Sequence, residues 1–263
     1  MAKTYLDAIV AAHRQRAQSD DRDWRQRSIS VNPVSLEGAL RAHRPQGNAV
    51  IAEIKRASPS KGVLQPNLNP AELALQYQTG GASAISVLTD VAHFGGSVTD
   101  LQLAHKAVAL PILRKDFTVS MNDVLDTAEM GASCVLLIAA ALDRVELRDF
   151  LHVASDVGLD ALVEVHDEVE AAVAVELGAT LIGVNQRDLH SFQVDTDRAE
   201  RVVAALPETV VRVAESGFHT PAAVARAASA GFDAVLVGEA FVTSDNPTQM
   251  VKSFTGFPIG RSS

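Results

Sequence analysis

The stretch Gly131-Ala132-Ser133-Cys134-Val135-Leu136-Leu137-Ile138 decides how this chain folds. A glycine after an amphipathic segment commonly ends a helix, and the five apolar residues that close the stretch are typical of a buried strand. The same junction returns at Gly80-Gly81-Ala82-Ser83, Leu177-Gly178-Ala179-Thr180 and Ala230-Gly231-Phe232-Asp233. This recurrence indicates an internal repeat in which each helix leads directly into a strand.

Eight apolar segments rich in β-branched residues recur along the chain, and we expect each to form a strand. Amphipathic segments lie between them. Several begin with a capping side chain before Pro or Glu, as at Asn69-Pro70 and Asp143-Arg144-Val145-Glu146. The expected strands are Ala49–Ile54, Ser83–Leu88, Leu110–Leu113, Cys134–Ile138, Asp160–Val165, Leu181–Val184, Val210–Val213 and Ala234–Val237.

Strands that alternate with helices favour parallel pairing, and eight such units favour an α/β fold closed into a (β/α)8 TIM barrel. An open doubly wound sheet is the alternative, but the turn after the first strand lacks the G-x-G-x-x-G motif of such folds. Residues 1–48 are expected to form an N-terminal helical extension, with helices at Thr4–Ala17 and Ser35–His43, that covers one end of the barrel. Residues 49–263 would form the catalytic barrel, in one structural domain overall.

Composition narrows the class of protein. With 47% hydrophobic and 21% charged residues among 263, the chain can fill a sizeable core. A formal net charge of −9 and the lack of a Lys/Arg run argue against nucleic acid or an anionic membrane as partner. The longest apolar run, Cys134–Leu142, is too short to cross a bilayer. We therefore expect a cytoplasmic protein. The sequence leaves its oligomeric state open, with a monomer as the working expectation.

The single cysteine and four of the histidines give no sign of redox or metal chemistry. Cys134 is the only cysteine, which excludes an internal disulfide and favours a reducing compartment, and its apolar surroundings predict a buried hydrophobic role. His13, His105, His152 and His219 have no metal-like spacing with carboxylates. We expect surface or capping positions for them and no metal site.

Charged side chains gather where the expected strands end, and in a barrel those ends form the mouth. Because side chains alternate across a strand, Glu53 and Lys55 share one face of the first strand. Buried charges are costly unless they are paired, so a functional site is the first interpretation. The expected set is Glu53, Lys55, Lys115, Glu164, Asn185, Arg187 and Glu215. Proximity of Lys55 to Lys115 would lower the pKa of one lysine toward neutrality.

Glycines after the last two strands suggest a phosphate site. Ser216-Gly217 follows the seventh strand and Gly238 follows the eighth, where barrels often hold phosphate on backbone N–H groups. Lys55 and Ser58 would add a cation and a hydroxyl. A small phosphorylated molecule is therefore the expected ligand, and the negatively charged Glu239 should point away from its phosphate.

At these residues the chain resembles the indole-3-glycerol-phosphate synthase family, from about Ala49 to Phe241. Gln186 departs from the family pattern, where Asn or Ser is expected, but its side chain should face outward. The motifs that carry the resemblance are Ile51-Ala-Glu-Ile-Lys-Arg-Ala-Ser-Pro-Ser-Lys-Gly62, Ser86-Val-Leu-Thr-Asp90 with Phe94 and Gly96-Ser97, Leu113-Arg-Lys-Asp-Phe117, Leu162-Val-Glu-Val-His166, Ile182-Gly-Val-Asn-Gln-Arg-Asp-Leu189, Ala214-Glu-Ser-Gly217 and Leu236-Val-Gly-Glu-Ala240.

The resemblance implies conversion of 1-(2-carboxyphenylamino)-1-deoxyribulose 5-phosphate to indole-3-glycerol phosphate, with loss of carbon dioxide and water and with no metal or organic cofactor. It implies that Lys115 is the general acid and that Glu164 acts in the later proton removal. The remaining implied roles are acid/base chemistry for Glu53 and Lys55, positioning for Asn185, Glu215 and Arg187, phosphate binding for Ser58, Ser216, Gly217 and Gly238, and an apolar wall for the anthranilate ring from Pro59, Phe94, Phe117 and Leu189.

Two other functions fit a phosphate-binding barrel. A sugar-phosphate isomerase would commonly carry Cys and Asp at the ends of strands one and five, where this chain has Lys55 and Glu164. A noncatalytic phosphate-binding barrel would tolerate the loss of Lys115 or Glu164. Ultraviolet absorbance separates the first alternative, because indole formation changes the spectrum whereas isomerisation leaves the anthranilate chromophore nearly intact.

Overall fold

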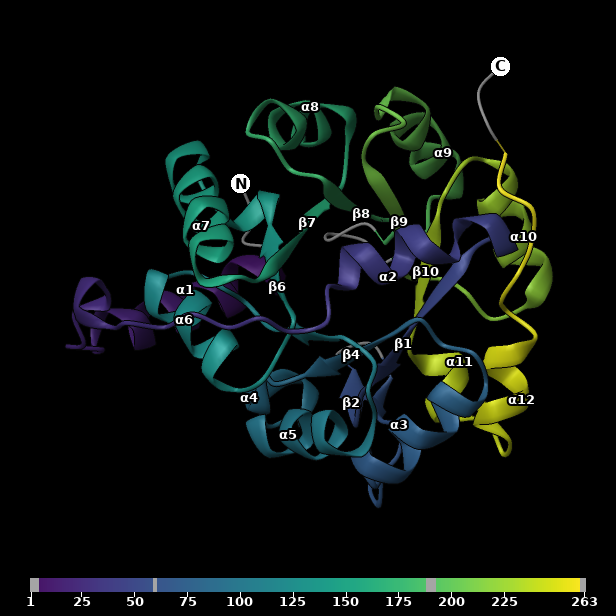
Figure 1. Ribbon diagram of the computed structural model, residues 1–263, viewed down its shortest axis with the longest axis horizontal. Coiled ribbons are helices and arrows are strands. Elements are labelled where there is room, and N and C mark those ends of the chain that lie inside the picture. Colours follow the sequence, from purple (N-terminus) through teal and green to yellow (C-terminus); the bar gives the residue numbers. More distant parts are fainter. Residues whose placement is uncertain (1–4, 59–60, 188–192, 261–263) are drawn as a thin grey trace.

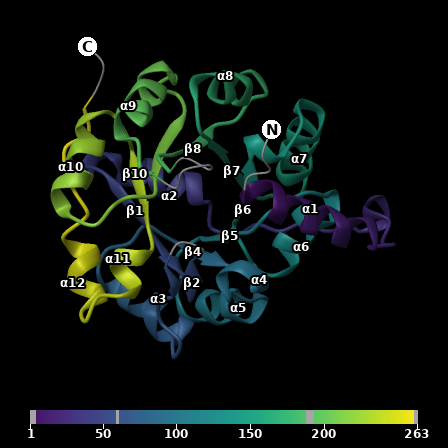
Figure 2. The same ribbon diagram turned by 180° about the vertical axis from the view of Figure 1, so that it is seen from behind.

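The computed structural model describes residues 5–58, 61–187 and 193–260. Eight parallel strands close into a barrel in the order β1-β10-β9-β8-β7-β6-β5-β4 (Figures 1 and 2). The predicted (β/α)8 fold is therefore confirmed. The strands are β1 Ala49–Ile54, β4 Ala84–Leu88, β5 Ile112–Lys115, β6 Cys134–Ile138, β7 Asp160–Val165, β8 Leu181–Asn185, β9 Val211–Glu215 and β10 Ala234–Val237.

Helices surround the barrel, and two short strands after β1 form a separate antiparallel pair (Figure 1). This pair is β2 Ala57–Ser58 and β3 Gly62–Val63. The helices around the barrel are α3 Pro70–Thr79, α4 Val91–Phe94, α5 Val98–Ala107, α6 Met121–Glu129, α7 Arg144–Val157, α8 Glu168–Glu176, α9 Thr196–Ala205, α10 Pro221–Ser229, α11 Glu239–Val242 and α12 Pro247–Lys252, with a 3-10 turn at Ala139–Ala141.

Strand ends carry the main difference from the sequence prediction. Strands β1, β6, β7 and β10 have the predicted bounds. Three others run further, through Lys115 in β5, Asn185 in β8 and Glu215 in β9. Each of these three is a predicted site residue. Their backbones are thus held by the sheet, which fixes the side chains more firmly than a loop would.

Two apolar layers follow from the alternation of side chains along each strand. One set of strand residues fills the barrel interior and includes Cys134, which is fully buried as predicted. The other set packs outward under the helices, as Val135 and Leu137 do against α6 and α7. The barrel interior is therefore a filled core.

The repeated glycine junctions adopt one conformation. Gly81, Gly131, Gly178 and Gly231 all have φ between 88° and 102°, in the left-handed region that side chains disfavour. The residue after each glycine donates its N–H to a carbonyl five residues back, as Ala179 does to Ala174 at 3.0 Å. This is the Schellman arrangement, which ends a helix and turns the chain into the next strand.

The N-terminal extension covers both ends of the barrel, whereas the sequence predicted one. Helix α2, Leu36–His43, buries Leu36 and Leu40 completely against residues at the starts of the strands, including Val211. Helix α1, Tyr5–Gln18, lies at the opposite end, where Ile9 faces the mouth. Figure 1 has α2 on the near side and Figure 2 has α1 there.

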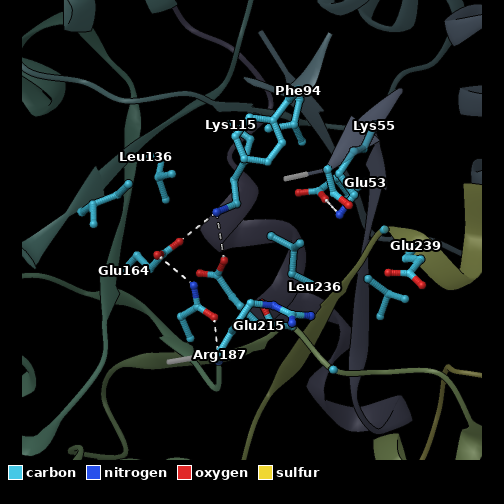
Figure 3. Close-up of a pocket in the computed structure, with 18 of the residues that line it drawn as sticks. Glu53, Lys55, Phe94, Lys115, Leu136, Glu164, Arg187, Glu215, Leu236 and Glu239 are labelled. Carbon is cyan, nitrogen blue, oxygen red and sulfur yellow. Dashed lines mark hydrogen bonds and ion pairs between the residues drawn. The ribbon is translucent and has the colours of Figure 1, made fainter. Parts of the chain in front are cut away.

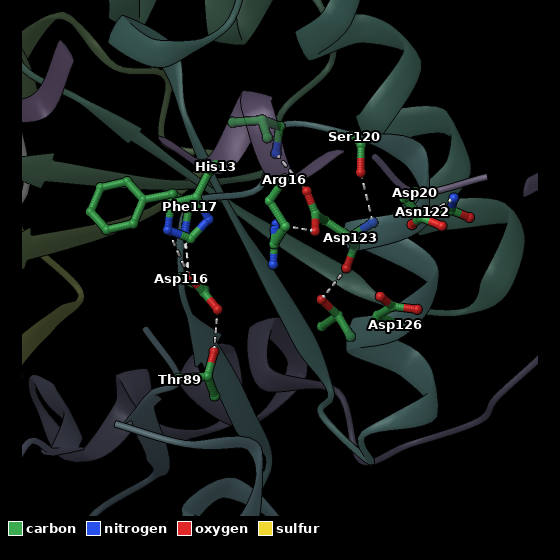
Figure 4. Close-up of polar contacts among 12 residues, drawn as sticks. His13, Arg16, Asp20, Thr89, Asp116, Phe117, Ser120, Asn122, Asp123 and Asp126 are labelled. Carbon is green, nitrogen blue, oxygen red and sulfur yellow. Dashed lines mark hydrogen bonds and ion pairs between the residues drawn. The ribbon is translucent and has the colours of Figure 1, made fainter. Parts of the chain in front are cut away.

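Ion pairs hold the N-terminal segment against α6 (Figure 4). Arg16 lies 2.6 Å from the buried carboxylate of Asp123, and Arg22 and Arg27 both bind Asp126. The side chain of Asn122 also donates to Asp20 at 3.0 Å. Exposed pairs contribute little singly, but a network on one helix fixes the path of the segment that carries α1.

Among the described residues, no helix is both long enough and apolar enough to cross a membrane.

Replacing Gly178 by Ala should destabilise the fold by about 1 kcal/mol, because its φ of 88° is strained for any residue with a Cβ while nothing lies within 4 Å of the added methyl group. Urea unfolding measures the change. Gly178→Asn is the matched control and should lose less, since Asn tolerates this conformation. Equal stability of Gly178→Ala and the parent protein would contradict this account of the junctions.

Candidate active site

A cavity of about 220 Å³ opens at the carboxyl ends of the strands. It contains every predicted site residue that the structure describes. Pro59 and Leu189 lie outside the described residues. The predicted residues that line the cavity are Glu53, Lys55, Ser58, Phe94, Lys115, Phe117, Glu164, Asn185, Arg187, Glu215, Ser216, Gly217 and Gly238.

Lys115 is the centre of the polar floor (Figure 3). Its Nζ lies 2.8 Å from Glu164 Oε2 and 3.2 Å from Glu215 Oε2. Asn185 donates from Nδ2 to the other oxygen of Glu164 at 3.0 Å and accepts the backbone N–H of Arg187 at 3.0 Å. Four strands, β5, β7, β8 and β9, thus contribute to one connected set of polar groups.

The carboxylates set the charge of this lysine. Burial alone would lower the pKa of Lys115, but the attraction of Glu164, Glu215 and Glu53 outweighs it and raises the pKa well above its usual value. For Lys115, the prediction that a neighbouring lysine would bring its pKa toward neutrality is therefore wrong. Lys115 has carboxylates as its nearest charged neighbours, and it is a firmly protonated ammonium.

The two carboxylates on Lys115 differ from each other. Burial raises the pKa of Glu164, but the nearby Lys115 and His166 lower it by a larger amount, so the net shift is downward. For Glu215, burial dominates, Lys115 offsets only part of it, and repulsion from Glu164 adds to the rise, so the pKa reaches about 7. Glu164 is consequently the charged partner of Lys115, and Glu215 is the one able to keep a proton near neutrality.

Two glycines leave room for these carboxylates. Gly183 lies on the interior face of β8, and an added Cβ there would collide with Glu215 Oε1. Gly238, after β10, would place a Cβ 2.5 Å from Glu53 Oε1 and 2.9 Å from Lys55 Nζ. A side chain at either position would therefore have to displace these charged groups from their ion pairs.

A second ion pair lies beside the first. Lys55 Nζ is 2.8 Å from Glu53 Oε1, and Ser86 donates to the other Glu53 oxygen at 3.4 Å. Glu53 is 4% exposed and Lys55 is partly buried, so the pair faces the cavity from β1. The alternation argument for these two residues is confirmed. Glu239, also on the cavity wall, lies 3.8 Å from Lys61.

The turn after β9 is held in an uncommon conformation. Ser216 has φ 71°, the one non-glycine residue with positive φ among those described, and Gly217 follows with φ 82°. Gln186 donates from its side chain to the Ser216 carbonyl at 3.1 Å. Gln186 points away from the barrel interior, as predicted, but it is 4% exposed and supports this turn. Strain of this kind often marks a ligand-binding position.

An apolar wall faces the charged floor. Phe94 and Phe117 stack with ring centroids 6.3 Å apart, and Leu136 and Leu236 from the barrel interior complete the wall. Tyr5, Leu6 and Ile9 of α1 add to it. Sequence reasoning missed the contribution of α1, because a contact between the N-terminus and the barrel mouth leaves no local pattern.

The surface prediction is wrong for His13. The residue is 9% exposed, and its Nε2 lies 3.0 Å from Asp90 Oδ2. Its ring packs against Phe117 with centroids 5.3 Å apart (Figure 4). His105, His152 and His219 are exposed as predicted. His13, Asp90 and Asp116 each offer an atom that can bind a metal ion, and these three atoms lie within 4.8 Å of one another. In the described part of the chain, no other set of three His, Cys, Asp or Glu residues comes as close.

This group is already occupied by internal contacts. Asp116 accepts from Arg114 at 2.9 Å and from the hydroxyl of Thr89, and Asp90 accepts the backbone N–H of His93 at 2.6 Å. Such partners satisfy the carboxylates as an ion-pair network. The arrangement ties α1 to the ends of β4 and β5 next to the cavity.

Comparisons with known proteins agree with this geometry. A family model described as indole-3-glycerol phosphate synthase matches residues 3–254. A protein of that name from Mycolicibacterium vanbaalenii is 46% identical over 254 residues, covering 94% of this chain and 92% of its own length. Another from Nocardioides sp. is 51% identical over 213 residues, covering 81% of this chain and 82% of its own length.

A solved structure shares the fold alone. The thiamine phosphate pyrophosphorylase of Pyrococcus furiosus superposes with a TM-score of 0.60 at 15% identity, covering 80% of this chain and 95% of that chain. The match of one family model to nearly the whole chain, with relatives near half identity along most of it, settles the affiliation. The chain belongs to the indole-3-glycerol phosphate synthase family.

Proposed function

We propose that this protein converts 1-(2-carboxyphenylamino)-1-deoxyribulose 5-phosphate to indole-3-glycerol phosphate, carbon dioxide and water, as the names of its relatives indicate. One observation carries the proposal beyond the names. A buried ammonium, Lys115, lies between two carboxylates of different proton affinity and opposite an apolar wall that fits an aromatic ring. Ring closure and dehydration need those three features together.

Ring closure forms a bond between the carboxylated ring carbon and the ribulose carbonyl carbon, so negative charge develops on the carbonyl oxygen. Lys115 would meet that oxygen as an ammonium and transfer its proton to it, leaving a hydroxyl group. Loss of carbon dioxide then restores electrons to the ring. Because the ammonium is fixed before the substrate arrives, no reorganisation is needed when the charge appears.

Transfer of that proton changes Glu164. In the free protein the pKa of Glu164 is lowered by Lys115. Once Lys115 is neutral, the main attraction that kept Glu164 charged is gone, and Glu164 becomes a stronger base. The new hydroxyl group would leave as water with a proton from the acid/base set that Glu53 and Lys55 complete, and Glu164 would remove the proton whose loss completes the indole ring. Lys115 therefore acts first as the acid and Glu164 second as the base. The two roles are coupled because Lys115 Nζ and Glu164 Oε2 lie only 2.8 Å apart.

The remaining site residues would hold the substrate. Glu215 can donate a hydrogen bond to a ribulose hydroxyl while it keeps its proton, and Asn185 fixes Glu164. Glu53 and Lys55 would complete the acid/base set. Phosphate would bind the turns after β9 and β10 at Ser216, Gly217 and Gly238, with help from Ser58, Lys55 and Arg187.

The proposal also includes a cytoplasmic location, which the single cysteine and the net charge of −9 support. The direct test is turnover of the purified chain on the carboxyphenylamino ribulotide, followed by the ultraviolet change of indole formation. A product that keeps the anthranilate spectrum would instead favour an isomerase.

Lys115→Met should fold normally and lose at least about a hundredfold in kcat, because both the acid and the fixed charge are removed. Indole absorbance gives the rate and circular dichroism checks the fold. Lys106→Met, on the exposed face of α5, is the matched control and should keep full activity. Turnover of Lys115→Met at the parent rate would refute the role of this lysine.

Glu215→Gln should make the protein more stable at pH 8 but not at pH 5. The folded pKa of Glu215 is raised to about 7, so the folded state holds the proton more tightly than the unfolded one. Its stability contribution is thus complete below the unfolded pKa and lost as pH rises through 7. At pH 8 we expect a gain of about 1–3 kcal/mol in the unfolding free energy.

Urea unfolding of the parent and Glu215→Gln proteins at the two pH values measures this difference. Glu208→Gln, at an exposed position, is the control and should show no pH-dependent gain. If Glu215→Gln is no more stable than the parent protein at pH 8, then burial of the ionised Glu215 carboxylate does not destabilise the fold.

A further inference from the structure

Glu164 is on β7, and His166 is the first residue after that strand, two positions further along the chain. By alternation the two side chains lie on the same side, yet His166 does not line the cavity. Its side chain is 9% exposed, and Nε2 lies 3.5 Å from Glu164 Oε1. This nitrogen is buried and has no hydrogen-bond partner in the part of the chain that the structure describes. A buried polar atom without a partner is uncommon and calls for a functional explanation.

The other ring nitrogen is firmly held. Nδ1 of His166 lies 3.1 Å from Oε2 of Glu170, and the backbone N–H of His166 donates to the same oxygen at 2.8 Å. Glu170 is in the first turn of α8, and the backbone N–H of Glu170 is capped by Asp167 at 2.8 Å. The ring therefore has a fixed orientation, with one nitrogen on the Glu170 carboxylate and the other 3.5 Å from Glu164 Oε1.

We propose that His166, clamped by Glu170, is a positioning residue that holds the Glu164 carboxylate in place and in its charged form. The inference rests on the role proposed above for Glu164. His166 touches no part of the cavity, so it acts through Glu164 and not on the substrate.

The charges around the two residues support this arrangement. Burial alone would lower the pKa of His166, but its bond to Glu170 and the fields of Glu164 and Glu215 raise it, which favours the imidazolium. The imidazolium is the second cation that acts on Glu164, after Lys115.

The second cation matters at one stage of the reaction. When Lys115 has given up its proton, His166 is the cation left beside Glu164. Its positive charge, 3.5 Å from Glu164 Oε1, keeps this carboxylate ionised until Glu164 takes the substrate proton. Asn185 on β8 donates to the same oxygen of Glu164, whereas Glu215 on β9 is the acidic group whose mutual repulsion with Glu164 His166 opposes; Glu53 on β1 is paired with Lys55.

His166→Gln tests the proposal, because a Gln side chain keeps a polar amide beside Glu164 but carries no charge. We expect the acid-side midpoint of the kcat–pH profile to move to higher pH by about one unit or more, with KM changed less than about threefold. Glu170→Gln should move the midpoint in the same direction by a smaller amount, and it keeps the test valid should His166→Gln fail to fold. Glu168→Gln, exposed on the same turn of α8, is the control.

Glu164→Gln, alone and combined with His166→Gln, separates the two levels of the argument. If His166 acts through Glu164, the double variant should turn over at the rate of Glu164→Gln within about twofold. Full turnover by Glu164→Gln would overturn the proposed base together with this inference. A slow Glu164→Gln beside unshifted pH profiles for His166→Gln and Glu170→Gln would overturn the inference alone and leave the proposed function standing.

Discussion

The attraction between Lys115 and the carboxylates around it is the constraint on which the rest of the site depends. Ionised groups lose most of their hydration in a cavity walled by apolar side chains, and each would be costly alone. Glu164 on β7 and Glu215 on β9 reach the ammonium on β5 from alternate strands, while Glu53 takes Lys55 as its own partner. Glu215 is the carboxylate on which this cost falls. Burial raises its pKa most, Lys115 offsets only part of that rise, and repulsion from Glu164 and Glu53 adds to it.

The barrel brings these groups together through strand register. Leu88 pairs with Lys115, Ile138 with Glu164, and Asn185 with Glu215, so the last one or two residues of neighbouring strands lie side by side around the rim. Side chains of the same parity then point to the axis at one height. Small residues allow the approach. Gly183 has no side chain where the Glu215 carboxylate lies, and a methyl group there would push apart the contacts with Lys115.

Sequence patterns were sufficient where the determinants are local. The glycine junctions, the eight apolar segments and the alternation in Glu53 and Lys55 predicted the fold and the direction in which these side chains point. Patterns failed where the determinant is a distant contact. The pKa prediction for Lys55 and Lys115 took into account only the repulsion between the two lysines. Carboxylates from other strands instead decide the proton affinity of Lys115. Burial of His13 likewise depends on Asp90, 77 residues away, which no local periodicity reveals.

That contact also joins the N-terminal helix to the chemistry. His13 reaches Asp90 directly and lies 4.0 Å from Asp116, and Asp116 is the residue next to Lys115. A displacement of α1 would thus remove Ile9 from the apolar wall and disturb the strand end that fixes the ammonium. Both effects would weaken the electrostatic action of the Lys115 ammonium. Water in the cavity would screen its charge, and a less ordered strand end would no longer fix its position. The extension is therefore part of the site in a physical sense, although most of the polar residues come from the barrel.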